Sequence, residues 1–194
     1  GKEKVADAGP GTHPTMRAYR AEAYGGVAWA NELARQGYVV LAPDVFPFGS
    51  RRVHVLDVPD NVRPVSLPDG EYDDPAAILE YDLWAAQYES VIAKSLFCAG
   101  TTWPGVWLAE DRVALDVLCA RADVDPGRVG CAGLSLGGLR TCYLAGLDDR
   151  IACAVCVGMM TTWRDYLLHK SYTHTWMIYI PHLARDLDYP EVLG

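Results

Sequence analysis

The chain has 194 residues, of which 51% are hydrophobic and 22% charged, and its formal net charge is -8. This length predicts one domain, residues 1–194, with a sizeable core, because domains of roughly 100–200 residues are usual. The acidic balance and a single adjacent basic pair, Arg51-Arg52, argue against a nucleic-acid or anionic membrane surface. No apolar run reaches the roughly 18 residues of a membrane span, so we expect a soluble protein with neither partner.

The chain begins at Gly1 with neither an initiator Met nor the apolar core of a signal peptide, so a mature start and an internal fragment look alike here. The six cysteines mostly fall in apolar stretches, which favours buried, reduced thiols. Cys153 and Cys156 stand three apart in an expected strand and should face opposite sides, which argues against a redox or metal pair. We therefore expect a cytoplasmic protein without metal or organic cofactor, with secretion left open because the true N-terminus is not seen.

The first elements are an expected helix over about residues 25–36 and an apolar, β-branched run at 38–42 that predicts a buried strand. Residues 45–75, rich in Pro, Gly, Asp and Arg, predict a long connection of the kind that often carries function. Asp44, just after the strand, is expected to anchor this loop.

Two long helices are expected next, over about 75–97 and 104–122. Their predicted apolar stripes are Ile78, Tyr81, Ala85, Tyr88, Ile92 and Leu96 in the first helix, and Val106, Ala109, Val113 and Val117 in the second.

A turn at 124–128 leads into a strand over 128–132, a tight corner over 133–138 and a helix over 139–147. A third strand is expected over 151–157, whereas 175–180 could be a short strand or an apolar loop. This alternation of strand and helix predicts a mostly parallel sheet flanked by helices, an α/β fold.

The corner contains the pattern G-x-S-x-G, in which Ser135 is flanked by Gly133 and Gly137. A strand directly before it and a helix directly after it are the context that a nucleophile elbow requires. Side chains two positions before and after the serine are expected to collide with backbone, so glycine is needed at both. Neither a Walker loop nor the dinucleotide pattern G-x-G-x-x-G fits the spacing. We predict that Ser135 is a catalytic nucleophile and that the N–H of Leu136 is part of the oxyanion hole.

Several segments resemble the dienelactone hydrolase-like and acetyl xylan esterase-like branch of the α/β-hydrolases. They are 37–44, 48–51, 111–116, 124–138 and 147–151, and together they cover most of residues 25–160. The resemblance implies the α/β-hydrolase fold. It also implies an esterase, because dienelactone hydrolase itself has cysteine where this chain has Ser135.

A serine nucleophile needs a histidine base and an acid, which in this fold follow the serine in the order acid, then histidine. Asp186 or Asp188 could be the acid, but no histidine follows either. The resemblance also places an oxyanion loop before Gly1. We therefore expect an internal fragment of a longer esterase, incomplete at both ends and inactive alone, with acid and histidine outside it. The alternative is a compact variant that pairs Asp165 or Asp149 with His169 or His174.

Three further residues are candidates for contact with substrate. Arg51 follows a predicted strand on the side where α/β sheets bind ligands, although an ion pair with a neighbouring carboxylate is the simpler interpretation. Met159 and Trp163 follow the third strand at the same edge and could line an acyl or sugar pocket, although apolar residues after a strand are more often core residues. No metal site is predicted, because Asp111 and Asp116 stand five apart and do not share one face of their helix.

The leading hypothesis is thus a serine carboxylester hydrolase that acts on a small-molecule acetyl ester. The alternatives are a non-catalytic α/β-hydrolase-like binding module and a peptidase of the prolyl oligopeptidase kind. The sequence does not indicate the oligomeric state.

Overall fold

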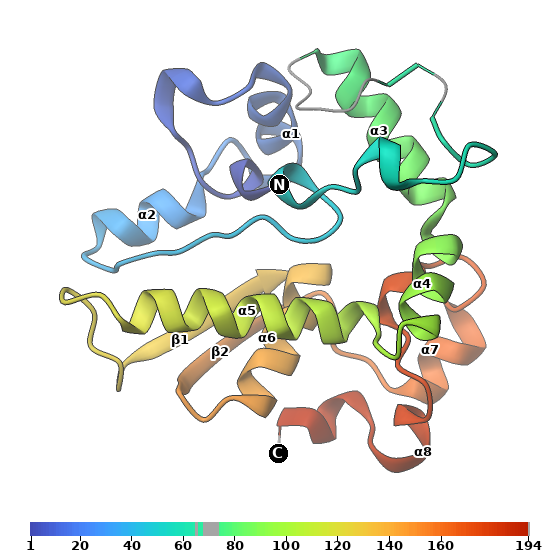
Figure 1. The fold of residues 1–194 in the computed structure, drawn as a ribbon. Coiled ribbons are helices and arrows are strands. Elements are labelled where there is room, and N and C mark those ends of the chain that lie inside the picture. The colour runs from blue at the N-terminus through green and yellow to red at the C-terminus, as the bar shows by residue number, and fades with distance from the viewer. Residues whose placement is uncertain (65, 68–73, 194) are drawn as a thin grey trace. The chain divides into compact units, whose positions relative to one another are not determined.

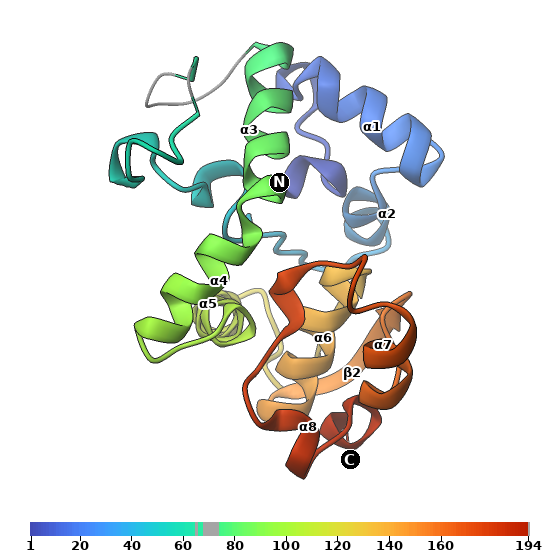
Figure 2. The ribbon, with the colours of Figure 1, turned by 90° about the vertical axis from the view of Figure 1, so that its right-hand side faces the viewer.

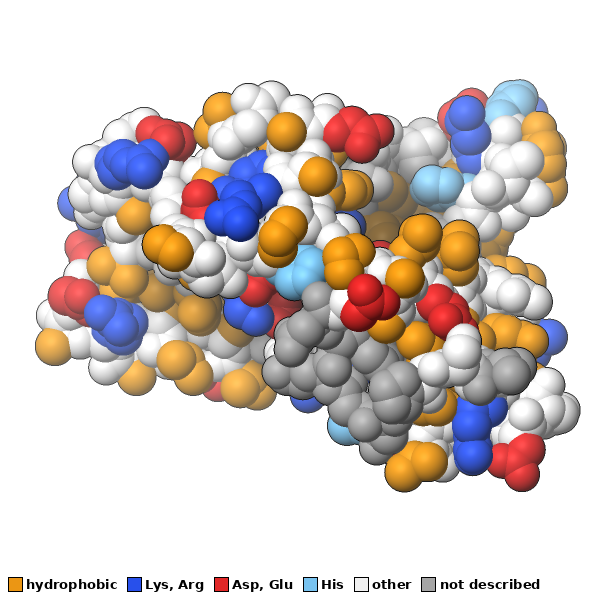
Figure 3. Space-filling model, turned by 90° about the horizontal axis from the view of Figure 1, so that it is seen from above, with side chains coloured by type: hydrophobic (Ala, Val, Ile, Leu, Met, Phe, Trp, Pro, Cys, Tyr) orange, Lys and Arg blue, Asp and Glu red, His pale blue; other side chains and the backbone are white. Residues whose placement is uncertain are grey.

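A computed structural model describes residues 1–64, 66–67 and 74–193 (Figure 1). The chain divides into two compact units, Gly1–Tyr88 and Glu89–Gly194, which are described separately. Within the described residues, every helix is too short or too polar to cross a membrane. On the face drawn in Figure 3, acidic and basic side chains are interspersed with hydrophobic ones.

The first unit is helical. Its α-helices are α1 (Pro14–Tyr24), α2 (Trp29–Arg35) and α3 (Pro75–Gln87), joined by segments that include short 3-10 helices at Lys2–Lys4, Gly9–Gly11, Gly49–Arg51 and Val55–Asp57. Helix α2 confirms the helix expected over 25–36, although it begins only at Trp29. Helix α1 was not predicted, yet its signals are present in the sequence: Pro14 opens it and Gly25, in the left-handed conformation at φ 59°, follows its end.

The strand predicted at 38–42 is wrong. These residues form no strand, and Tyr38 and Leu41 are 63% and 44% exposed. The described residues of this unit contain no strand at all. An extended segment becomes a strand only when a neighbouring strand completes its hydrogen bonds. A β-branched apolar run indicates the propensity of a segment but not the presence of its partner.

The long connection after residue 45 is held against α3, as far as it lies in the described residues. The Tyr81 hydroxyl donates to the Pro47 carbonyl at 2.7 Å and accepts from the Val53 N–H at 2.9 Å. Trp84 Nε1 donates to the Val62 carbonyl at 2.7 Å. The buried core of the unit gathers around these two rings and consists of Val55, Val58, Leu67, Tyr81, Trp84 and Ala85.

Asp44 anchors its loop, as expected. Its carboxylate accepts hydrogen bonds from the N–H and hydroxyl of Ser50 and forms an ion pair with Lys2 at 2.7 Å. Burial alone would raise the pKa of Asp44, but the hydrogen bonds from Lys2 and Ser50 outweigh it and lower the pKa to about 2.

The single helix expected over 75–97 is instead two helices, α3 and α4 (Glu89–Cys98). Tyr88 separates them with backbone angles of φ -102° and ψ 14°, outside the helical range. No Gly or Pro marks this break, and the apolar periodicity continues through it, so the pattern alone could not reveal it.

The second unit contains a parallel pair of strands, β1 (Val129–Leu134) and β2 (Ile151–Val157), which confirms the two strands predicted there. Helix α6 (Leu136–Leu147) connects the strands and packs along both of them. Figure 2 shows α6 beside β2. The described part of the unit also has helices α4, α5 (Trp103–Cys119), α7 (Trp163–His169) and α8 (Leu183–Asp186), and 3-10 helices at Trp176–Ile178 and Tyr189–Leu193. Thus 175–180 is an apolar loop with a 3-10 turn, one of its two expected forms. The arrangement is α/β, with two strands visible in the described residues.

The buried face of α5 is not the predicted one. Val113 and Val117 are 62% and 58% exposed, whereas Trp107 and Leu115 are buried. These two pairs point to opposite sides of the helix, because two positions correspond to about 200° of rotation. Apolar residues occur on both sides, so periodicity could not choose between them; the side with the larger rings is buried.

Helices α5 and α6 cover one face of the strand pair. Their shared core contains Leu115 of α5, Leu144 of α6 and Val129 of β1. The opposite face is left open: Leu134 and Val155 are 44% and 54% exposed.

All six cysteines are free, as the sequence indicates. Burial was predicted too broadly: Cys142 is buried, but Cys98 and Cys153 are exposed. Cys153 is paired with Gly130 of β1, and its side chain lies on the open face of the strand pair.

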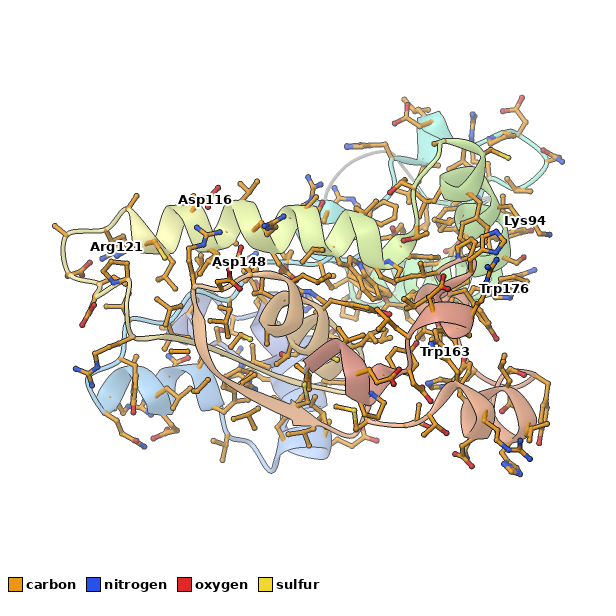
Figure 4. All side chains as sticks on the ribbon, turned by 90° about the horizontal axis from the view of Figure 1, so that it is seen from below. Lys94, Asp116, Arg121, Asp148, Trp163 and Trp176 are labelled. Carbon is orange, nitrogen blue, oxygen red and sulfur yellow. The ribbon has the colours of Figure 1, made fainter. Side chains whose placement is uncertain are left out.

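A carboxylate at the end of α6 joins the helices to β2. Asp148 is 6% exposed and accepts hydrogen bonds from Arg112 of α5 and from the side chain and N–H of Arg150. Arg150 also binds Asp116 at 2.6 Å, and both aspartates are labelled in Figure 4. The hydrogen bonds from Arg150, assisted by Arg112, hold the pKa of Asp148 well below its usual range.

We expect Asp148→Asn to lower the free energy of unfolding at pH 7 by about 1–3 kcal/mol, because charged hydrogen bonds are lost at a buried position. A depressed pKa gives stability that is present above the unfolded value near about 4 and lost as pH falls through the folded value. The difference between wild type and variant should therefore shrink as urea unfolding is repeated below about pH 4. Asp149→Asn is the matched control, since Asp149 is exposed; equal effects of the two variants would contradict this role.

Candidate active site

Ser135 lies between the last residue of β1 and the first residue of α6. Its backbone has φ 56° and ψ -119°, a region that residues other than glycine rarely adopt and that costs about 1–3 kcal/mol. The conformation is held from both sides: the Ser135 N–H donates to the Val157 carbonyl of β2 at 2.8 Å, and the Ser135 carbonyl accepts from the Leu139 N–H of α6 at 3.0 Å. Strand and helix together impose the strained backbone of a nucleophile elbow.

The tight turn depends on Gly133 and Gly138. A Cβ at Gly133 would lie 2.2 Å from the backbone C and O of Gly137. A Cβ at Gly138 would lie 2.9 Å from the Val157 carbonyl oxygen and 3.2 Å from Met159 Cβ. The collision predicted for a side chain at Gly137 is wrong, because a Cβ there would meet nothing within 4 Å. The collision is one-sided: Gly137 supplies the backbone that a side chain at 133 would strike.

Leu136 is the first residue of α6. The first N–H groups of a helix have no acceptor within it, and the helix dipole places partial positive charge there. An N–H at this position can donate a hydrogen bond to an oxyanion that forms next to Ser135, which is the role predicted for Leu136.

A small apolar crevice adjoins the elbow and is lined by Gly138, Leu139, Cys142, Cys156, Met159, Met160 and Tyr189. Met159, a predicted candidate, is therefore beside the elbow. Burial raises the pKa of Cys142 to about 11 and also raises that of Cys156, so both thiols are uncharged at neutral pH and contribute to an apolar wall.

The other two candidates for substrate contact are not among the residues that line this crevice. Trp163, at the start of α7 in Figure 4, is 5% exposed and stacks on Tyr189 with ring centroids 4.6 Å apart. It supports the crevice from behind rather than lining it. Arg51 lies in the first unit, at the end of the 3-10 helix Gly49–Arg51. Tyr189 was missed by sequence reasoning, and no local pattern marks it, because it reaches the crevice from far along the chain.

The structure also tests the acids and histidines considered for a triad. Asp165 and His169 form a pair in α7, with Oδ1 and Nδ1 3.2 Å apart and both side chains mostly exposed. Asp188 accepts from the N–H groups of Trp163 and Tyr189, and so holds the chain behind the crevice. Within the described residues, no hydrogen bond joins a histidine to the Ser135 hydroxyl.

The two aspartates of α5 that the sequence excludes as a metal pair, Asp111 and Asp116, form ion pairs instead. Asp111 of α5 binds Arg140 of α6 through both oxygens, and Asp116 binds Arg150. In the part of the chain that the structure describes, no three His, Cys, Asp or Glu side chains are grouped as metal ligands.

A strand, a strained serine and a helix follow one another here in the order that a nucleophile elbow requires. Comparison with known proteins gives the wider class of the chain. Residues 99–191 match the prolyl oligopeptidase family. The chain is 29% identical over 168 residues to a Bacillus subtilis (strain 168) protein named "Putative hydrolase YtaP"; the match covers 85% of this chain and 44% of that protein. The chain thus spans less than half the length of this relative. No solved structure gives a significant match. Together these findings support the α/β-hydrolase superfamily, without distinguishing its branches.

Proposed function

We propose that the protein is a serine hydrolase of carboxylic esters, with Ser135 as its nucleophile. The observation that carries the proposal is the backbone of Ser135 at φ 56°, fixed between a parallel strand and a helix start. A strained residue at such a position costs stability, and strain of this kind clusters at active sites. The match to the prolyl oligopeptidase family and the likeness to a protein named as a hydrolase support the same reaction class.

In this mechanism Ser135 Oγ attacks the acyl carbon while its proton passes to a histidine. The Leu136 N–H donates to the oxyanion that forms on the carbonyl oxygen. The alkoxide leaves with the proton from the histidine, and water then releases the acyl group as a carboxylic acid and restores the serine. The histidine and its acid are proposed to come from outside residues 1–194, and the chain alone is expected to be inactive. The chemistry requires neither metal nor organic cofactor.

The resemblance of several segments to the dienelactone hydrolase-like and acetyl xylan esterase-like branch favours a small acyl group. The crevice beside the elbow has mostly apolar walls but no room for a water molecule in this structure, so it does not by itself supply an acyl site. On this resemblance we propose an acetyl ester as the substrate. We further propose a cytoplasmic protein with a small-molecule substrate and without nucleic-acid or membrane partners, in line with its acidic composition.

A fluorophosphonate probe tests the nucleophile, because it reacts covalently with activated serines. We expect the full-length protein to be labelled, Ser135→Ala to be unlabelled, and Ser95→Ala, whose hydroxyl donates to the Val91 carbonyl on the surface of α4, to be labelled like wild type. Residues 1–194 alone should stay unlabelled. An unlabelled full-length protein would contradict the proposed hydrolase activity and favour the non-catalytic binding module.

The second candidate is a peptidase, which the match of residues 99–191 to the prolyl oligopeptidase family favours. Comparing kcat/KM for an acetyl ester and for a prolyl peptide anilide separates the two. We expect the ester to be the better substrate; a higher value for the peptide would replace the esterase by the peptidase.

A further inference from the structure

The first unit contains a cleft of about 410 Å³ that the proposed esterase chemistry does not use. It lies between Arg20 of α1, the segment around Val27, and Glu32 and Arg35 of α2, with Asp7 at its side. Sites for small organic molecules typically have volumes of about 300–1,000 Å³. The cleft is therefore large enough for a ligand.

Arg20 is the unusual residue of this cleft. Its side chain is only 4% exposed, and its Nη1 lies 3.2 Å from Asp7 Oδ2. Its Nε and Nη2 are buried without a hydrogen-bond partner in the described part of the chain. A buried charged donor without an acceptor is costly, so an acceptor is expected to complete it.

In two other arginines of this chain, the edge formed by Nε and Nη2 binds a carboxylate. Arg121 directs Nε and Nη2 at the two oxygens of Asp123, at 2.9 and 2.7 Å. Arg140 binds both oxygens of Asp111 through the same two nitrogens. This edge of a guanidinium presents two parallel N–H groups that match the two oxygens of a carboxylate. In Arg20 the same edge has no hydrogen-bond partner in the described part of the chain, and Arg20 is one of the residues that line the cleft.

We propose that this cleft binds a small organic monocarboxylate, held by Nε and Nη2 of Arg20. Arg20 is paired with Asp7 and Arg35 with Glu32, so the cleft walls carry no net charge and favour a single negative charge over two. Val27 and Ala28 provide an apolar wall for the organic part of the ligand. Because the two nitrogens are buried, the proposed binding requires the guanidinium to turn toward the cleft.

The surroundings keep Asp7 from competing for this edge of Arg20. Asp7 Oδ1 accepts from the Thr12 hydroxyl at 2.6 Å and from the Gly9 N–H at 3.0 Å, and these bonds lower its pKa. The Asn31 side chain bonds both the N–H and the carbonyl of Asp7. Asp7 is thus fixed as an ionised partner of Nη1, which leaves Nε and Nη2 for the ligand.

Benzoate and its uncharged analogue benzamide test the site by calorimetric titration and by thermal unfolding of the full-length protein. Benzoate should bind saturably and raise the midpoint of unfolding, whereas benzamide should do neither, because ligands that bind only the folded state stabilise it. Inorganic phosphate should bind more weakly than benzoate. Equal binding of benzoate and benzamide, or no saturable binding of benzoate, would overturn the proposal.

Two variants locate the binding. Arg20→Gln should weaken benzoate binding about tenfold or more. Arg17→Gln should bind like wild type, since Arg17 is exposed on α1 and is not among the residues that line the cleft. If Arg20→Gln does not fold, Arg20→Lys, which keeps the charge but not the two-pronged edge, should show the same weakening. Unchanged binding in a folded Arg20 variant would contradict the site, and neither result depends on ester hydrolysis.

Discussion

Gly133→Ala is expected to lower the free energy of unfolding by about 4 kcal/mol or more, and to abolish any activity at the elbow. The new Cβ would lie 2.2 Å from the backbone C and O of Gly137, a distance at which backbone must move. Unlike a flexible side chain, the start of α6 cannot yield locally, because it is tied to β2 by the Ser135–Val157 hydrogen bond. Urea unfolding followed by circular dichroism measures the loss.

Gly137→Ala is the matched control, because it adds the same methyl group four residues later. Its Cβ would meet nothing within 4 Å, and it stands in the first turn of α6. Replacing a helical glycine by alanine stabilises by up to about 1 kcal/mol when no clash follows. The two variants should therefore change stability in opposite directions. Equal losses would show that the backbones at 133 and 137 do not approach as the structure has them.

The elements around the elbow could be predicted because their signals are local. The strands expected over 128–132 and 151–157 and the helix expected over 139–147 follow from apolar runs and a glycine pattern within about 30 residues. In the structure the first strand is Val129–Leu134, and the helix begins three residues earlier than expected, at Leu136. The N–H that suits an oxyanion follows from the same order of elements, since Leu136 has to open the helix. For Gly138, the only signal in the sequence is that it directly follows Gly137.

The errors arise where tertiary contacts decide. Tyr38 and Leu41 have strand propensity, but no strand pairs with them in the described residues of their unit. Val113 and Trp107 both satisfy helical periodicity, and packing buries only Trp107. Tyr189 joins the crevice through contacts with residues far away in the chain, which no short pattern encodes.

Ser135 itself allows catalysis and strain to be separated. Ser135→Ala should reduce kcat/KM for an acetyl ester by about 10³-fold or more, because the attacking oxygen is gone. Ser135→Gly should reduce it equally. The two variants differ in stability, since alanine keeps a Cβ in the strained backbone at φ 56° and glycine does not.

We therefore expect Ser135→Gly to raise the free energy of unfolding by about 1–2 kcal/mol, and Ser135→Ala to leave it nearly unchanged. The gain is bounded by the strain of one residue and reduced by the greater freedom of glycine in the unfolded chain. Thermal unfolding of the two variants beside wild type measures the difference. A glycine variant no more stable than the alanine variant would mean that the turn around Ser135 is relaxed. The serine would then occupy an ordinary corner, and its conformation would no longer argue for a nucleophile.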